Sequence, residues 1–274
     1  MNPNPTKSWL RAGNAFVPCD AIPISDRGFR HGMAVFESLP VLRGAPLFLP
    51  QHCERLRAAC ADTGLLAAIP AWTEFEALLR GVPFDAFARI YVTAGDGGVS
   101  GSTEHGRVFV FAEPQARHQT FSNDGYRLAT HPAPHTPLFP GLKTANYWAN
   151  IAALRRAREN QCDEALLFHP DGSLISACMA NVFIVRNGKF ETPSISSGAR
   201  PGVIREWVMR RRSVAERHIT PGDLRGAGEL FITNSRLGIM PAASLDGRLL
   251  ASRAAAAQLR VEYEKEISEV AAGG

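Results

Sequence analysis

Long apolar runs are missing from this chain of 274 residues. No stretch approaches the ~20 consecutive apolar residues that a transmembrane helix needs, so a membrane-spanning helix is excluded. The N-terminal stretch MNPNPTKSWLRAG also lacks the apolar centre of a secretory signal. Hydrophobic residues still form 45% of the chain and charged residues 20%, which is ordinary for a globular protein with a sizeable core. We therefore expect a cytoplasmic protein.

Cysteine is sparse and is not arranged in pairs. The chain has five, an odd number, and no C-x-x-C spacing. Disulfide scaffolds and zinc sites are both poor interpretations of such a pattern. We expect reduced thiols and no bound metal. The positions are Cys19, Cys53, Cys60, Cys162 and Cys178.

Neither sign of charge is in large excess, since the net charge is only +4. The single basic run, Arg210 to Arg212, has no aromatic residues interleaved with it that could stack on bases. The run is more typical of the solvated side of a helix than of a nucleic-acid patch. We expect neither a nucleic acid nor a membrane as partner.

Lysine is also scarce: of the 30 basic residues only four are Lys, and the other 26 are Arg. Three of the four, Lys7, Lys189 and Lys265, lie in polar surroundings. Lys143 follows Pro140-Gly141 in the stretch PGLKTANYWANIAALRRA, with no acid within ten residues on either side. A lysine without a partner near apolar side chains is expected to have a lowered pKa and can form an imine with an aldehyde. A solvated surface lysine is the alternative from the residues alone.

The order of patterns predicts two α/β units. Strand-like segments and the helix PQHCERLRAACADTGL, with Pro50 at its start and Gly64 at its end, predict a small N-terminal domain over residues 1–113. The polar stretch 114–123 reads as a linker. A larger C-terminal domain, 124–274, contains Lys143, a helix over 146–159, and a hairpin whose turn is Asn187-Gly188.

A phosphate site is predicted beside these elements. Pro201-Gly202 precedes the helix GVIREWVMRRR, and a helix N-terminus offers free backbone N–H groups to an anion. The strand FITNS ends in small polar residues that offer further donors. A reactive lysine together with a phosphate cradle suggests pyridoxal 5′-phosphate (PLP).

The motifs resemble, in order and spacing, the class IV aminotransferase family of fold-type IV PLP enzymes. This family includes branched-chain and D-amino acid aminotransferases and aminodeoxychorismate lyase. The resemblance implies an α+β or α/β fold of two domains with PLP in the cleft between them, and a homodimer. The matching segments are residues 26–56, 141–150, 163–205 and 228–248.

The resemblance also implies roles for individual residues. Lys143 would be the lysine that binds the cofactor and moves protons between Cα and C4′ of PLP. Tyr147 is similar to the family's residue near O3′ of PLP, although a stacking or core tyrosine is an open alternative. The remaining cofactor-binding positions, most of them at the phosphate, would be Arg55, Ser176, Val203, Ile204, Asn234 and Ser235.

Several departures from the family pattern bear on activity. Ser176, in SACMAN, stands where most relatives have the Glu that pairs with the protonated pyridine nitrogen of PLP. Met33 and Ala34 replace Asp and Gly in the stretch GMAVFE, and the loop AGDGG lacks an Arg common in relatives. A hydroxyl cannot hold the ring proton as a carboxylate does, so the ring should stabilise a carbanion less.

Three functions remain open at this stage. The first is an aminotransferase that passes an amino group from an amino acid to a 2-oxo acid. The second is aminodeoxychorismate lyase, which eliminates pyruvate to give 4-aminobenzoate; the segment FITNSRLGIMPAASLDGR and Ser176 favour it. The third is a non-catalytic protein of the same fold, which the retained Lys143 and Arg55 disfavour.

Overall fold

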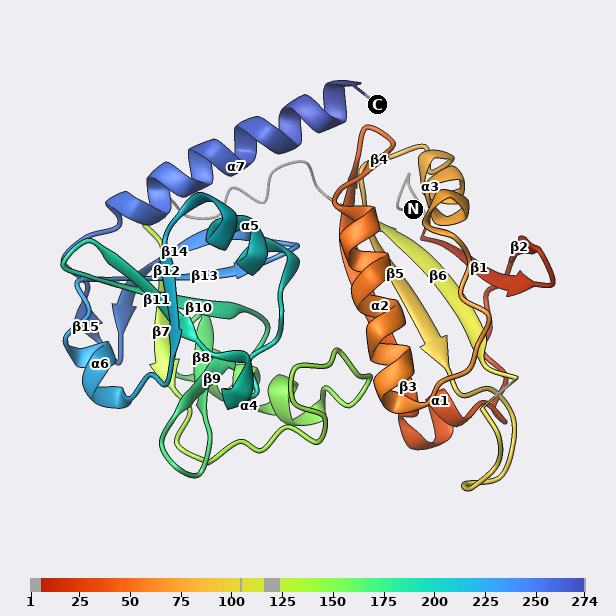
Figure 1. Ribbon diagram of the computed structural model, residues 1–274, viewed down its shortest axis with the longest axis horizontal. Helices are drawn as coiled ribbons and strands as arrows, with labels where there is room; N and C mark the ends of the chain where they lie inside the picture. Colours follow the sequence, from red (N-terminus) through yellow and green to blue (C-terminus); the bar gives the residue numbers. More distant parts are fainter. Residues whose placement is uncertain (1–5, 104, 116–123, 274) are drawn as a thin grey trace. The chain divides into compact units, whose positions relative to one another are not determined.

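The computed structural model describes residues 6–103, 105–115 and 124–273 (Figure 1). By its packing the chain forms two compact units. The first comprises residues 1–119, 142–146 and 267–274, and the second comprises residues 120–141 and 147–266. The expected linker 114–123 lies mostly outside the described residues, and the expected domain boundaries stay a prediction. Lys143 packs with the first unit, although it follows part of the second in sequence.

The first unit is a six-stranded antiparallel sheet in the order β2-β1-β6-β5-β3-β4. Its elements are β1 (Lys7–Ala12), β2 (Ala15–Pro18), α1 (Arg27–His31), β3 (Ala34–Leu42), β4 (Ala45–Pro46), α2 (Leu49–Thr63), α3 (Trp72–Arg80), β5 (Ala86–Thr93) and β6 (Arg107–Pro114).

Alternation along β3 decides which face of this sheet is the core. Val35 and Leu39 lie in a buried apolar cluster with Leu49 and Leu56 of α2. Because successive side chains of a strand point to opposite faces, Phe36 lies on the face away from this cluster. The sheet therefore has one face packed on helices and another that carries Phe36.

The second unit contains a nine-stranded mixed sheet, with the path β12-β11-β10-β13-β14-β7-β8-β9 and β15 paired to β14. Its strands are β7 (Tyr126–Thr130), β8 (Glu164–Phe168), β9 (Leu174–Ala177), β10 (Asn181–Arg186), β11 (Lys189–Pro193), β12 (Val214–Arg217), β13 (Glu229–Asn234), β14 (Gly238–Leu245) and β15 (Arg248–Leu249). Its helices are α4 (Trp148–Glu159), the short 3-10 helix η1 (Ile195–Ser197), α5 (Val203–Arg211) and α6 (Pro221–Arg225). Helix α7 (Ala254–Gly273) belongs to this unit as far as Glu266.

Most of the expected elements are confirmed. Helix α2 ends at Thr63, with Gly64 in the left-handed region at φ 67°, as the sequence predicted. The hairpin turn between β10 and β11 has φ of 50° at Asn187 and 76° at Gly188, both positive as a type I′ turn requires. The two-unit α+β architecture is likewise confirmed.

Helix α4 begins two residues later than expected, at Trp148 rather than Asn146. The cause is long-range: Thr144 forms an antiparallel bridge with Val35 of β3, so the backbone before the helix is extended. Asn146 then donates its side-chain amide to the carbonyl of Gly32 at 3.3 Å instead of lying in the helix.

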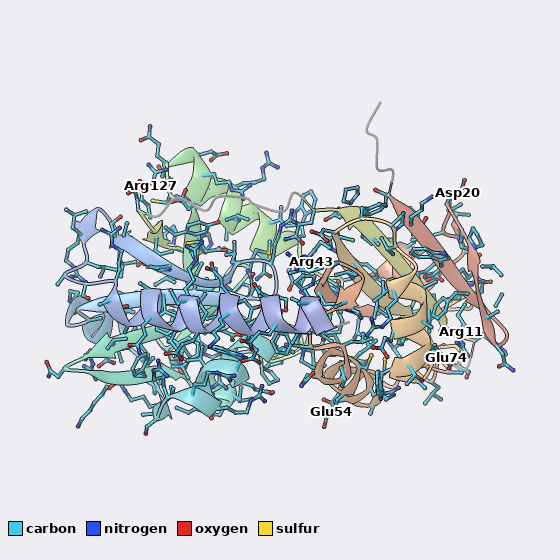
Figure 2. All side chains as sticks on the ribbon, turned by 90° about the horizontal axis from the view of Figure 1, so that it is seen from above. Arg11, Asp20, Arg43, Glu54, Glu74 and Arg127 are labelled. Atoms are coloured by element: carbon cyan, nitrogen blue, oxygen red, sulfur yellow. The ribbon has the colours of Figure 1, made fainter. Side chains whose placement is uncertain are left out.

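Surface charge adds little to this framework. Figure 2 labels Arg11 of β1 and Glu74 of α3, whose Nη1 and Oε2 atoms are 2.6 Å apart in an ion pair. Arg11 is 13% exposed and Glu74 39%, and ion pairs at the surface contribute up to about 1 kcal/mol to stability. The buried apolar clusters stabilise the fold instead.

Candidate active site

Lys143 lies on a short extended segment, not in a helix. The backbone N–H of Phe36 donates to the carbonyl of Lys143 at 2.9 Å, and the N–H of Ala145 donates to the carbonyl of Ala34 at 2.8 Å. These two bonds add residues 143–145 to the edge of β3. The backbone of the predicted cofactor lysine is thereby fixed against the sheet, while its four-carbon side chain keeps its reach.

The amine of Lys143 lies over an aromatic ring. Its Nζ atom is 4.1 Å from the centroid of the Phe36 ring, within the range of a cation–π contact. Phe36 stacks on Tyr91 of β5 with centroids 4.9 Å apart, and Tyr91 stacks on Phe111 of β6 at 5.9 Å. The lysine therefore lies at one end of an aromatic row on the sheet face opposite α2.

Arg55 takes part in a buried charge network. Its Nε and Nη2 atoms each donate to Glu37 at 2.7 Å, in the bidentate geometry that suits guanidinium and carboxylate. His52 Nδ1 is 2.7 Å from Glu37 Oε2, and both His52 and Glu37 are buried. The predicted phosphate-binding arginine is thus held in one orientation by the acid on β3.

This network shifts two pKa values. Burial by itself raises the pKa of Glu37, but the charge of Arg55 and hydrogen bonds from His52 and Arg55 outweigh it and hold that pKa well below its usual range. Burial lowers the pKa of His52, and the charges of Arg55 and Lys143 act in the same direction against the pull of Glu37. Because ionised Glu37 can only accept, Nδ1 of neutral His52 carries the proton in their bond.

The loop that follows β5 is held by one arginine. Arg27 is fully buried, and its guanidinium donates to five backbone carbonyls between residues 94 and 102. Ala94, in the stretch where relatives commonly have an arginine, is itself buried in the apolar core of this unit. The departure AGDGG therefore puts a core residue at this point rather than a side chain free to meet a substrate.

The predicted phosphate cradle lies in the second unit, at the start of α5. Val203 and Ile204 form the first turn and are both buried. Their N-cap is Gly202, which has no side chain with which to cap them. The side-chain amide of Asn181 donates to the carbonyl of Arg200 at 2.8 Å, and a Cβ on Gly202 would lie 2.0 Å from Oδ1 of Asn181. Asn181 and Gly202 together set the path of the chain into the helix.

Tyr147 and Asn234 are both held by contacts within the second unit. Tyr147 is the N-cap residue of α4, and the guanidinium of Arg200 lies 5.7 Å from the centroid of its ring. Asn234 accepts from the amides of Arg236 and Leu237 and donates to the carbonyl of Met179 at 3.1 Å. Asn234 thus shapes the turn that carries Ser235, which is half-buried.

Ser176 is half-buried on β9, opposite Leu167 of β8 in the strand register. The buried carboxylate in its neighbourhood along the chain is that of Glu164, which accepts the amide of Cys178 at 3.1 Å. Burial raises the pKa of Glu164. Ser176 thus offers a hydroxyl and not a carboxylate at this point of β9.

Sequence reasoning missed several residues of this arrangement. Glu37 is an acid at a core-facing position of an apolar strand, and His52 and Arg55 are spaced i, i+3 on one helix face; both signals were readable. Asn181 and Glu164 had no such local signal, because their partners lie on other elements.

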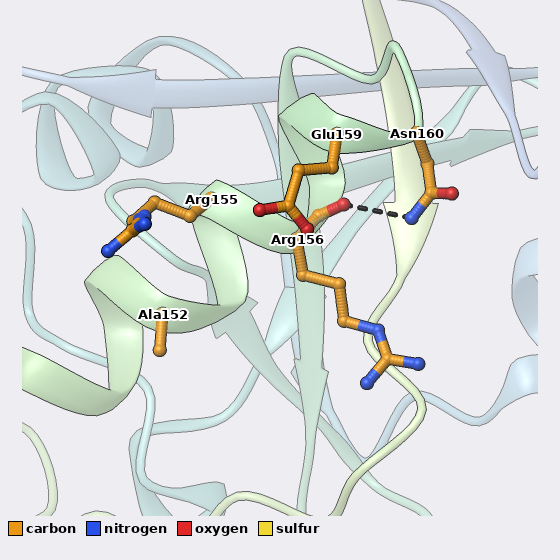
Figure 3. A pocket seen from close by; sticks show the side chains of 5 residues that line it. All are labelled: Ala152, Arg155, Arg156, Glu159 and Asn160. Atoms are coloured by element: carbon orange, nitrogen blue, oxygen red, sulfur yellow. Dashed lines mark hydrogen bonds between the residues drawn. The ribbon is translucent and has the colours of Figure 1, made fainter.

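The groove on the outer side of α4 is a different feature. It is lined by Ala152, Arg155, Arg156 and Glu159 of α4 and by Asn160, the C-cap residue of that helix, all exposed (Figure 3). Its hydrogen bond runs from the Asn160 side chain to the carbonyl of Arg156, at 2.9 Å. None of the predicted site residues lines it.

The described part of the chain offers neither a metal site nor a membrane span. No group of three or more His, Cys, Asp or Glu side chains there could hold a metal ion. No helix within those residues is both long and apolar enough to cross a bilayer. The five cysteines are unpaired.

Comparison with known proteins identifies the family. The sequence profile of amino-transferase class IV matches residues 34–245, which is more than half of the chain. The chain belongs to the class IV aminotransferases. This membership confirms the predicted resemblance and enzyme class, a PLP-dependent aminotransferase or lyase. It also confirms PLP as the cofactor.

Relatives of this class IV enzyme fall into both activity groups. A Methanocaldococcus jannaschii protein, provisionally named a branched-chain-amino-acid aminotransferase, is 28% identical over 242 residues, covering 84% of each chain. Aminodeoxychorismate lyase of Bacillus subtilis is 25% identical over 262 residues, covering 89% of each chain. The crystal structure of the Thermoproteus uzoniensis branched-chain aminotransferase with norvaline superposes with a TM-score of 0.85 at 23% identity, over 94% of this chain and 93% of that one. The last likeness shows a shared fold.

Proposed function

We propose that this class IV enzyme is an aminotransferase that moves an amino group from an amino acid to a 2-oxo acid. The observation that carries the proposal is the placement of Lys143. Its backbone is paired to β3 and its amine lies over Phe36, beside the network of Glu37, His52 and Arg55. Two class IV relatives are named as aminotransferases for branched-chain amino acids and for D-alanine.

The residues fit the cofactor that the family uses. The N-cap residue of α5, Gly202, has no side chain that could cap the helix. The dipole of the helix favours an anion at this end. The hydroxyl of Thr233, opposite Asn181 in the strand register, is buried and has no hydrogen-bond partner among the described residues. An unpaired buried hydroxyl and an uncapped helix both suit a bound phosphate.

Six of the predicted residues then have a role. Bound PLP supplies the electron sink that makes the Cα proton removable. Lys143 takes that proton and returns it at C4′, as an amine whose protonation state can change. The amides of Val203 and Ile204, the hydroxyl of Ser235 and the guanidinium of Arg55 hold the phosphate. The side chain of Asn234 shapes the turn before Ser235 rather than contacting the phosphate.

Spectroscopy tests this proposal directly. The purified enzyme should show the absorbance band of lysine-bound PLP, and a suitable amino acid should convert it to the amine form of the cofactor. A 2-oxo acid should restore the band. The Lys143→Ala variant should lack the band, and activity should fall by about 10²–10⁴ because the proton carrier is lost. A variant that keeps the band would overturn the role of Lys143.

Aminodeoxychorismate lyase is the second candidate, and Ser176 is the observation that favours it. A neutral pyridine ring handicaps transamination, which needs protonation at C4′, more than an elimination that expels a group once Cα has lost its proton. Release of 4-aminobenzoate from aminodeoxychorismate by the wild type would establish the lyase. Ser176→Glu should raise transamination relative to elimination, and an unchanged ratio of the two rates would contradict the reasoning.

We also propose a cytoplasmic homodimer. The unpaired cysteines suit a reducing compartment. The first unit exposes large apolar side chains on neighbouring segments, Ile22, Ile24 and Phe29 before β3 and Val99 in the loop after β5. Ser25 and Asp96 join these segments through a 2.7 Å hydrogen bond. Apolar side chains gathered in this way suit contact with a second copy.

A further inference from the structure

The turn between β9 and β10 is held by side chains from three other elements. Residues 178–180 leave the sheet, although the N–H of Cys178 still donates to the carbonyl of Ala165 on β8 at 3.0 Å and the N–H of Ala177 donates to the carbonyl of Ala180 at 2.9 Å. Side chains supply the further partners of this turn. Glu164 of β8 accepts the amide of Cys178 at 3.1 Å. Asn150 of α4 donates to the carbonyl of Cys178 at 2.9 Å, and Asn234 of β13 donates to the carbonyl of Met179 at 3.1 Å. Three elements thus converge on two consecutive residues, and Figure 1 shows α4, β8 and β9 close together.

Of these three side chains, Glu164 costs the most free energy to bury. It is only 3% exposed, and within the described part of the chain it forms no ion pair; its acceptor oxygen is bonded to the amides of Ala165 and Cys178. A buried carboxyl group that is bonded to backbone amides and to the Cys178 thiol, with no ion pair, costs stability relative to an apolar side chain. An apolar residue would pack in this strand but would remove one hydrogen-bond acceptor from the turn.

The turn connects the parts of the site in this unit. Ser176 lies two residues before Cys178, Asn181 follows two residues after Met179, and Asn234 precedes Ser235. We propose that Glu164 and Asn150 are positioning residues that act through this turn to set Ser176 at the cofactor. This proposal rests on the proposed function, since it assumes that Ser176 meets PLP.

The chain contains a matched control for Glu164. Glu229 is also buried, at 4% exposure, and its carboxylate accepts the amides of Ala255 and Ala256 at the start of α7. It lies at the opposite end of β13 from Asn234, roughly 16 Å away for a strand of this length. Glu164→Leu and Glu229→Leu therefore remove the same kind of group, the first at the site and the second away from it.

The experiment compares cofactor binding and stability in these variants. PLP affinity is measured from the absorbance of the lysine-bound cofactor, and stability from urea unfolding. Glu164→Leu should weaken PLP binding about tenfold and shift the wavelength or pH dependence of the band. Glu164→Gln, which keeps an acceptor oxygen, should bind like wild type. Glu229→Leu should lose stability but keep both the affinity and the band.

Asn150 keeps the test informative if Glu164→Leu fails to fold. Asn150→Ala should weaken PLP binding about tenfold, whereas Asn160→Ala, which removes an amide bonded to the same helix, should not. Equal effects at Glu164 and Glu229, or at Asn150 and Asn160, would overturn the proposal. A wild type without any PLP band would instead refute the proposed function.

Discussion

At the residue scale, the acid on β3 and its partners on α2 form the buried charge network of the first unit. Glu37 is bonded to His52 and Arg55, 15 and 18 residues further along the chain. Removing Arg55 would leave the buried charge of Glu37 without its counterpart, which typically costs 3–5 kcal/mol for a buried pair. The network therefore couples the orientation of Arg55 to the state of charge of two other side chains.

The pH dependence of stability follows from His52. Its pKa is lowered in the folded chain, so the unfolded chain takes up a proton first as the pH falls below ~6.5. The stabilising contribution is complete above that pH and is lost on acidification. His52→Asn keeps a donor for Glu37 but does not titrate. The free energy of unfolding of this variant should fall less than that of wild type between pH 7 and pH 5.

Urea unfolding at pH 7, 6 and 5 provides the measurement. The exposed His105, in the same unit, supplies the comparison variant His105→Asn. Identical pH slopes for wild type and His52→Asn would show that His52 does not contribute.

At the element scale, the entry into α5 is the most constrained point of the second unit. A Cβ on Gly202 would lie 2.0 Å from Asn181 Oδ1, far inside contact distance. Gly202→Ala should therefore shift the start of α5, destabilise the fold by about 1–3 kcal/mol and weaken PLP binding. Gly226→Ala, whose nearest contacts would be ordinary at 3.7 and 3.8 Å, is the matched control. Calorimetry and PLP titration of both variants would decide; an unaltered PLP affinity in Gly202→Ala would contradict the cradle.

The elements also show where sequence reasoning succeeds. Helix α5 follows Pro201-Gly202 and α2 ends before Gly64, because these residues act locally on the backbone. The start of α4 was placed wrongly because Thr144 pairs with Val35, more than a hundred residues earlier. Nothing in the stretch around Lys143 signals that pairing. Glu164, Asn150 and Asn181 were missed for the same reason, since each bonds to a residue on another element.

At the scale of the whole molecule, the order of the family motifs was sufficient to predict the two-unit fold and the cofactor. It was not sufficient to predict the order of the strands in each sheet. Contacts that are remote in sequence decide that residues 142–146 pack with the first unit. Local pattern could not reveal this, because the segment has neither strand-like alternation nor a turn of its own. Lys143 was found from its chemistry, not from its place in the fold.

Assembly is the prediction that belongs to this scale. If the apolar side chains around Ile24 meet a second copy, Ile24→Asp should convert the dimer to a monomer, because it would place a charge in an apolar contact. Light scattering after size exclusion would measure the mass. Val261→Asp, at an exposed apolar position on α7, is the control and should leave the mass unchanged. A wild type that is already monomeric would refute the proposed homodimer.

The clamp formed by Arg27 has a consequence for directed evolution of this enzyme. The loop over residues 94–102 is held by one guanidinium bonded to its carbonyls and by Asp96, whose carboxylate accepts from Ser25 and Arg107. Val99 is exposed there, and Gly98 has open space where a Cβ would be. A library that varies these two positions and keeps Arg27 would sample new loop surfaces on an unchanged backbone.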